Sequence, residues 1–88
     1  MKINENYVLQ EVADENIIIP VGEAADKLHG IIKLNITGAY LWKLLSQDDL
    51  STEELTEKMI TEFSVDEGTA KEDISMFVKQ LSEYGCFE

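Results

Sequence analysis

The sequence predicts an α+β domain in which a three-stranded antiparallel sheet is followed by three helices. Up to about residue 34, the chain holds short runs rich in β-branched residues that polar residues interrupt. From residue 36 onward, apolar residues recur at helical spacing. With 88 residues, of which 44% are hydrophobic, the chain has enough apolar side chains for one small core. We therefore expect a single domain over residues 1–88.

Three runs of β-forming residues predict strands at about residues 7–13, 16–20 and 30–34. Asp14 and Glu15 separate the first two runs, which favours a β-hairpin, and Pro20 ends the second run where the ladder needs no N–H donor. Residues 21–29 form a connection of mixed character. Because these links are short, we expect an antiparallel meander with the third strand at an edge, where Lys33 would discourage mispairing.

Capping signals predict helices at about residues 36–46, 51–63 and 67–84. Asn35 can cap the first helix. Ser51 and Glu54 have the spacing of a capping box at the start of the second helix. The third helix can begin after either Asp66 or Thr69, since both residue types cap helices.

Each predicted helix has an apolar face, and the end of the third helix carries a stop signal. Gly85 stands where a helix-ending glycine is expected. The apolar stripe of the third helix consists of Ala70, Ile74, Phe77, Val78 and Leu81. Tyr40 and Trp42 enlarge the apolar face of the first helix, and this face fits either the core or a patch that docks a partner.

The charge of the chain argues against two classes of partner. The 7 Lys and Arg residues against 18 Asp and Glu residues give a net charge of −11. Nonspecific binding to nucleic acid or to anionic membranes needs a basic surface, so we expect neither. The apolar runs are too short for a membrane span, and the first residues contain no apolar signal segment. We therefore expect a cytoplasmic protein.

Catalytic chemistry is scarce in this sequence. The one histidine, His29, and the one cysteine, Cys86, lie far apart along the chain, and no general base stands beside either. A single copy of each ligand type is too few for a zinc site. The acidic pairs fall mostly at helix starts, where they favour the helix dipole. We therefore expect no catalytic residues, no metal and no cofactor, and a protein that is not an enzyme.

Three helices beside a small sheet are also typical of winged-helix DNA-binding proteins. A DNA-binding regulator, or a protein–protein adaptor, is therefore the alternative function. In the third helix, however, acidic residues outnumber the two lysines, Lys71 and Lys79, and the chain has no arginine. Arginine makes the commonest specific contacts with guanine, and phosphate neutralisation supplies much of the affinity for DNA.

An edge strand beside an amphipathic helix can instead accept an extended peptide by strand addition. Ordering each peptide residue costs roughly 1–2 kcal/mol, so backbone pairing needs apolar anchors beside it. Met76, Gln80 and Tyr84 form a row beside the core stripe, where the wall of a groove would lie. The candidate peptide-binding residues are Ile31, Ile32, Lys33 and Leu34 of the third strand, with Asp73, Met76, Phe77, Gln80 and Tyr84 of the third helix.

Three segments of the chain resemble the PqqD family, which is named after coenzyme PQQ synthesis protein D. Residues 30–45, GIIKLNITGAYLWKLL, resemble the family's segment LN-x-T-[AG]-A-x-[IL]-[WL]-x-[LI]-[IL]. Residues 50–55, LSTEEL, followed by Phe63, are similar to its second helix. Residues 72–81, EDISMFVKQL, with the ending GCF at 85–87, are similar to its C-terminal part. The resemblance covers about residues 5–88.

This resemblance implies a winged-helix-like domain that recognises ribosomally made peptides destined for modification, a RiPP recognition element. Family members bind the precursor peptide or its leader as an added strand between the third strand and the third helix. They present it to a modifying enzyme, often a radical S-adenosylmethionine protein. Carried over by position, residues 31–34 form one wall of the site, and Asp73, Met76, Phe77 and Gln80 form the other. The implied function is that of a non-catalytic peptide chaperone.

Overall fold

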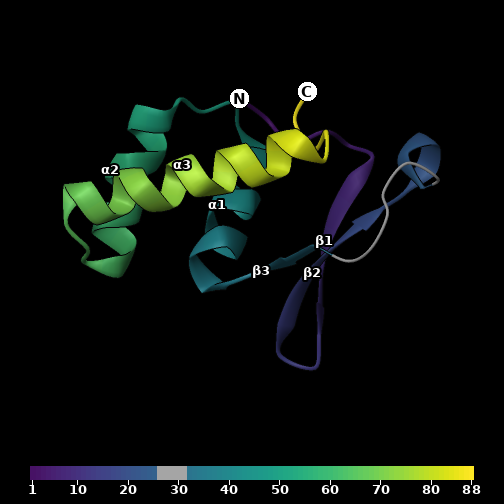
Figure 1. Ribbon diagram of the computed structural model, residues 1–88, viewed down its shortest axis with the longest axis horizontal. Helices are drawn as coiled ribbons and strands as arrows, with labels where there is room; N and C mark the ends of the chain where they lie inside the picture. The colour runs from purple at the N-terminus through teal and green to yellow at the C-terminus, as the bar shows by residue number, and fades with distance from the viewer. Residues whose placement is uncertain (26–31) are drawn as a thin grey trace.

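The computed structural model describes residues 1–25 and 32–88, and the order of its elements matches the predicted order (Figure 1). Each helix begins and ends within one residue of the range that the sequence predicts. Residues 30 and 31, at the start of the predicted third strand, lie outside the described residues, as does His29. The elements are β1 (Tyr7–Val12), β2 (Glu15–Pro20), a 3-10 helix (Gly22–Ala24), β3 (Ile32–Leu34), α1 (Ile36–Gln47), α2 (Thr52–Phe63) and α3 (Glu67–Glu83).

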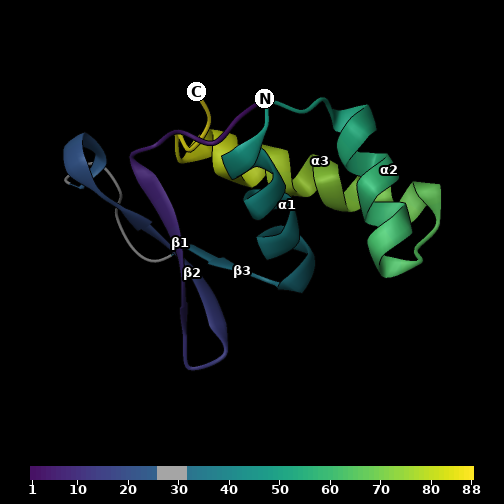
Figure 2. The ribbon, with the colours of Figure 1, turned by 180° about the vertical axis from the view of Figure 1, so that it is seen from behind.

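The three strands form an antiparallel meander with the order β1-β2-β3, which confirms the predicted fold class. The β1–β2 hairpin extends away from the helices, whereas β3 leads directly into α1 (Figures 1 and 2). Within the described residues, β3 pairs with β2 alone. The other edge of β3 therefore has no strand of the described residues beside it.

The two ends of the chain lie side by side next to the helices (Figure 2). Ile3 and Phe87 form an isolated antiparallel bridge, and the amide of Asn4 donates to the carbonyl of Cys86 at 2.8 Å. The amide of Ile3 also donates to the carbonyl of Leu45 in α1, at 3.1 Å. These bonds fix the C-terminal end of α3 relative to α1. In the part of the chain that the structure describes, no helix has the length and apolar character needed to cross a bilayer.

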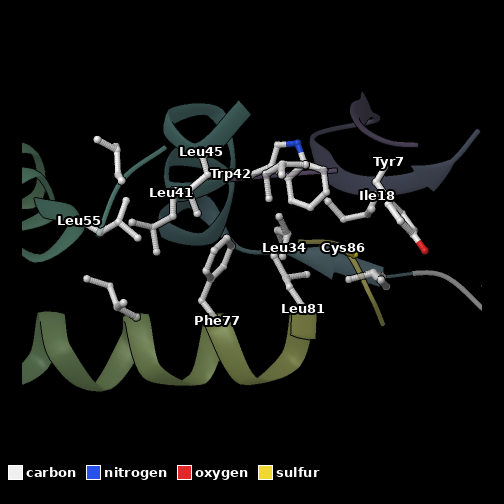
Figure 3. Packing of buried hydrophobic residues seen from close by; sticks show 14 of the residues in the cluster. Tyr7, Ile18, Leu34, Leu41, Trp42, Leu45, Leu55, Phe77, Leu81 and Cys86 are labelled. Carbon is white, nitrogen blue, oxygen red and sulfur yellow. The ribbon is translucent and has the colours of Figure 1, made fainter. Parts of the chain in front are cut away.

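The core lies where the three helices meet the inner face of the sheet (Figure 3). Trp42 is 2% exposed and belongs to this core. Tyr40 is half-buried at its border, where its ring meets Phe63 edge-on with 5.3 Å between the ring centroids. The most deeply buried side chains are Ile18, Leu41, Leu45, Leu55, Met59, Ile74, Leu81 and Cys86.

The start of each α-helix is capped by a side chain. Asn35 accepts a hydrogen bond from the first turn of α1. Ser51 and Glu54 form the predicted capping box, with the two bonds at 3.2 and 3.1 Å. Asp66, rather than Thr69, caps α3, because its carboxylate accepts a hydrogen bond from the amide of Thr69 at 2.6 Å. This hydrogen bond lowers the pKa of the Asp66 carboxyl group below its usual value. The caps therefore fix where the helices begin relative to the sheet.

The end of α3 is a Schellman motif. The amide of Cys86 donates to the carbonyl of Leu81 at 3.0 Å, and the amide of Gly85 donates to the carbonyl of Ser82 at 3.1 Å. Gly85 has a φ of +72°, which a residue with a side chain rarely adopts. This turn directs Cys86 into the core and lets Phe87 pack edge-on against Phe77 of α3.

The β1–β2 turn holds a non-glycine residue in a strained conformation. Val12 pairs with Glu15, so Ala13 and Asp14 alone form the loop, with φ angles of +50° and +68°. Both values are typical of a type I′ turn, in which asparagine and glycine are favoured. Alanine tolerates this region poorly, at a cost of roughly 1–2 kcal/mol.

We predict that Ala13→Asn raises the free energy of unfolding by about 0.5–1 kcal/mol, because asparagine adopts positive φ more readily. Urea unfolding followed by circular dichroism measures the change. Gln10→Asn places the same side chain on the extended backbone of β1 and serves as the control, since no gain is expected there. A loss of stability in Ala13→Asn would contradict the assigned turn.

Candidate functional site

A groove of about 510 Å³ lies between β3, the first turns of α1, and α3. It lies beside β3, which in the described part of the chain pairs with β2 alone. Its lining residues come from segments that are about forty positions apart in the sequence. They are Lys33, Leu34, Asn35, Thr37, Gly38, Leu41, Asp73, Met76, Phe77 and Gln80.

The floor of the groove is apolar. Leu34, Leu41 and Phe77 line it and are 8%, 1% and 5% exposed. Phe77 points from α3 toward α1, with Leu34 of β3 beside it (Figure 3). Met76, on the rim, is 64% exposed, an unusual setting for a large apolar side chain. A chain that enters the groove can therefore bury apolar side chains on the floor and against Met76.

The first turn of α1 forms part of the groove because Gly38 lacks a side chain. A Cβ atom at Gly38 would lie 3.1 Å from Oδ1 of Asn35 and 3.4 Å from Cβ of Leu34. Oδ1 of Asn35 accepts from the Gly38 amide at 2.8 Å and from the Thr37 hydroxyl at 3.0 Å. Glycine thus lets the capped end of α1 lie against the last residue of β3.

Six of the nine predicted site residues line this groove: Lys33, Leu34, Asp73, Met76, Phe77 and Gln80. Ile32 pairs with Ile18 and is 2% exposed, so its side chain belongs to the core. Tyr84 is the C-terminal cap of α3, beyond the described groove, and its carbonyl accepts from the Tyr7 hydroxyl at 3.2 Å. Ile31 lies outside the described residues.

The sequence reasoning missed the contribution of α1 to the groove. Asn35, Thr37, Gly38 and Leu41 line it, although the sequence analysis assigned them to the helix start and its apolar face. The sequence held a signal for Asn35, Thr37 and Gly38. A capping asparagine followed three residues later by glycine marks a helix start that a neighbouring strand can approach closely. Leu41 could not have been separated from the rest of the apolar face.

The groove is lined mainly by side chains suited to apolar contacts, hydrogen bonds and ionic contacts. Its one hydroxyl, on Thr37, donates to the capping Asn35. Cys86 lies in the core, outside the groove, where burial raises the pKa of its thiol to about 11. The residues that the structure describes contain no group of three or more His, Cys, Asp or Glu side chains placed to hold a metal ion.

Comparisons with known proteins give one family and one similar solved structure. The family model described as coenzyme PQQ synthesis protein D matches residues 7–86. A solved structure, described as TbiB1 in complex with the TbiA(beta) leader peptide, is similar over 100% of this chain and 95% of that one, with a TM-score of 0.75 and 25% sequence identity. A comparison with curated protein sequences gives no match.

We predict that the buried thiol makes the chain less stable at alkaline pH. The pKa of Cys86 is about 11 in the folded chain against a reference value of 9.0, so the folded state holds the proton more tightly. The free energy of unfolding should therefore fall as pH rises from 9 toward 11, by up to about 1.4 kcal/mol per pH unit.

Urea unfolding at a series of pH values measures this slope, and Cys86→Ala serves as the comparison. The variant keeps every other titrating group and loses only the contribution of the thiol, so its stability should fall less steeply above pH 9. Equal slopes for the two proteins would contradict the burial of a protonated thiol.

Proposed function

Since this chain belongs to the PqqD family, we propose that it binds a ribosomally made precursor peptide, or the leader of one, as a fourth strand on the free edge of β3. The observation that carries the proposal is the groove, which combines an unpaired strand edge with an apolar floor. The related complex with a leader peptide supports it as well.

Strand addition uses both features of the groove. A new strand lies about 4.8 Å from its neighbour and pairs its main chain with the free edge. Alternate side chains of the guest then point to one face, toward the floor that Leu34, Leu41 and Phe77 line. The β3 edge supplies affinity without regard to sequence, and the floor selects guests with apolar side chains.

The energies explain why both features are needed. Ordering one residue of a flexible peptide costs roughly 1–2 kcal/mol, and a typical hydrogen bond returns about 1 kcal/mol. Burying one large apolar side chain contributes about 1.5–3 kcal/mol. A guest held by backbone pairing alone would bind weakly, whereas two or three apolar anchors make the complex stable.

In this proposal the chain acts as a non-catalytic chaperone in the cytoplasm. It holds the guest and presents it to a separate modifying enzyme, such as a radical S-adenosylmethionine protein. The composition of the groove supports this division of labour, because none of its residues is a nucleophile that a neighbouring base activates. The chemistry would then come from the enzyme, and the chain would contribute selectivity.

Met76→Asp tests the proposal, with Ser75→Asp as the matched control. Met76 lines the groove and is mostly exposed, so its replacement should leave the fold intact. Ser75 is the adjacent residue of α3 and faces a different groove, between α2 and α3. The probe is a synthetic extended peptide with large apolar side chains at alternate positions, titrated by calorimetry.

We expect Met76→Asp to weaken binding of this peptide about tenfold, because an apolar contact is lost and a charge must be desolvated. Ser75→Asp should bind as the original chain does. Thermal unfolding of both variants shows whether the fold is retained. Equal affinity in Met76→Asp and the original chain would exclude this groove as the binding site.

A further inference from the structure

The groove has a charge balance that points to the chemistry of its guest. Two of its lining residues carry a formal charge, Lys33 and Asp73. The Lys33 ammonium lies 3.3 Å from the Glu15 carboxylate, on a neighbouring strand. The side chain of Asp73 is half-buried in the groove wall, and no cation or hydrogen-bond donor of the described residues contacts its carboxylate. Among the described residues, Asp73 is thus the charge of the groove that has no partner.

A guest peptide changes the surroundings of this carboxylate. In the free chain, water solvates Asp73, but a strand lying in the groove displaces part of that water. If the carboxylate loses water and gains no partner, the desolvation cost weakens binding of the guest. If the guest supplies a cation, a charge-assisted hydrogen bond offsets that cost. Asp73 therefore discriminates between guests by charge.

The distribution of charge along α3 adds to this effect. The α3 residues that line the groove are Asp73, Met76, Phe77 and Gln80, and Asp73 is the charged one among them. The lysines of α3 lie elsewhere: Lys71 and Lys79 line the groove between α2 and α3. The groove wall that α3 contributes therefore carries one negative charge, at Asp73, which attracts cations to it.

The spacing of the helix suggests where the cation of the guest stands. Asp73 and Phe77 are four residues apart, which separates them by about 6 Å along the axis of α3. Two residues of an extended strand span about 6.6 Å. In a guest running alongside α3, side chains two positions apart can therefore reach Asp73 and the apolar floor at Phe77 together.

From these observations we propose that Asp73 is a specificity-determining residue that selects guests carrying a lysine or arginine two positions from a large apolar residue. This inference rests on the proposed function, and it names the class of peptide that the groove accepts. The direction of the guest decides whether the cation precedes or follows the apolar residue.

Selection from a display library of random short peptides tests this inference. The library is sorted on the original chain, on Asp73→Asn and on Glu57→Gln. The Glu57 variant has the same net charge as the Asp73 variant, and its exposed site lies on α2, outside the groove. Thermal unfolding verifies that both variants fold.

We expect peptides selected on the original chain and on Glu57→Gln to carry a lysine or arginine two positions from a large apolar residue. Peptides selected on Asp73→Asn should lose that preference. In a selected peptide, replacing the cation by glutamate should weaken binding to the original chain about tenfold or more, the size of one charge-assisted hydrogen bond. Asp73→Lys should recover the affinity for the glutamate peptide.

The outcomes separate this inference from the proposed function. If the selected peptides bind but show the same preference for cations with Asp73→Asn, net charge explains the attraction, and the role of Asp73 is refuted. Selected peptides without any basic preference would refute it too. If no peptide is enriched on the original chain, the proposed function fails and the inference fails with it.

Discussion

The contact between the end of β3 and α3 holds together the two elements that form opposite walls of the groove. Leu34, the last residue of β3, faces the core beside Phe77 of α3. This packing holds a short strand in place while, in the described part of the chain, only one of its edges is paired. A strand with an unpaired edge needs such support, because three residues of pairing to β2 would stabilise it little by themselves.

The start of α1 and the end of α3 are also held in position around the groove. The Asn35 cap and Gly38 allow α1 to begin immediately after β3, so that the first turn of α1 forms one part of the groove. The Schellman motif after α3 and the bridge between Ile3 and Phe87 fix the other end of α3. A groove between fixed walls requires little rearrangement when a guest arrives, so less binding energy is spent on ordering the protein.

Local signals in the sequence account for much of this fold. The capping box at Ser51 and Glu54 is a local arrangement of a few residues, and such arrangements can be recognised without knowing the tertiary structure. The hairpin was also predictable, although its type I′ turn was not, because Ala13 at positive φ contradicts the usual preference of that residue.

The site was predictable in part. Helical periodicity pointed to Met76 and Gln80, which border the apolar stripe of α3 and line the groove, whereas the family resemblance pointed to Asp73. The same periodicity favoured Tyr84, but the described groove ends before the helix does. The part played by α1 depends on how closely two elements approach, which periodicity does not encode. That Lys33 has an ionic partner, whereas none of the described residues pairs with Asp73, likewise appears only in three dimensions.

Nuclear magnetic resonance of an isotope-labelled chain bound to an unlabelled guest peptide shows whether the guest backbone pairs with β3. Strand addition should give cross-strand contacts between backbone protons of the guest and those of Ile32–Leu34, together with slowed exchange of the β3 amides that face the guest. A bound guest whose backbone makes no contact with β3, and contacts α2 or the β1–β2 hairpin instead, would rule out strand addition at β3.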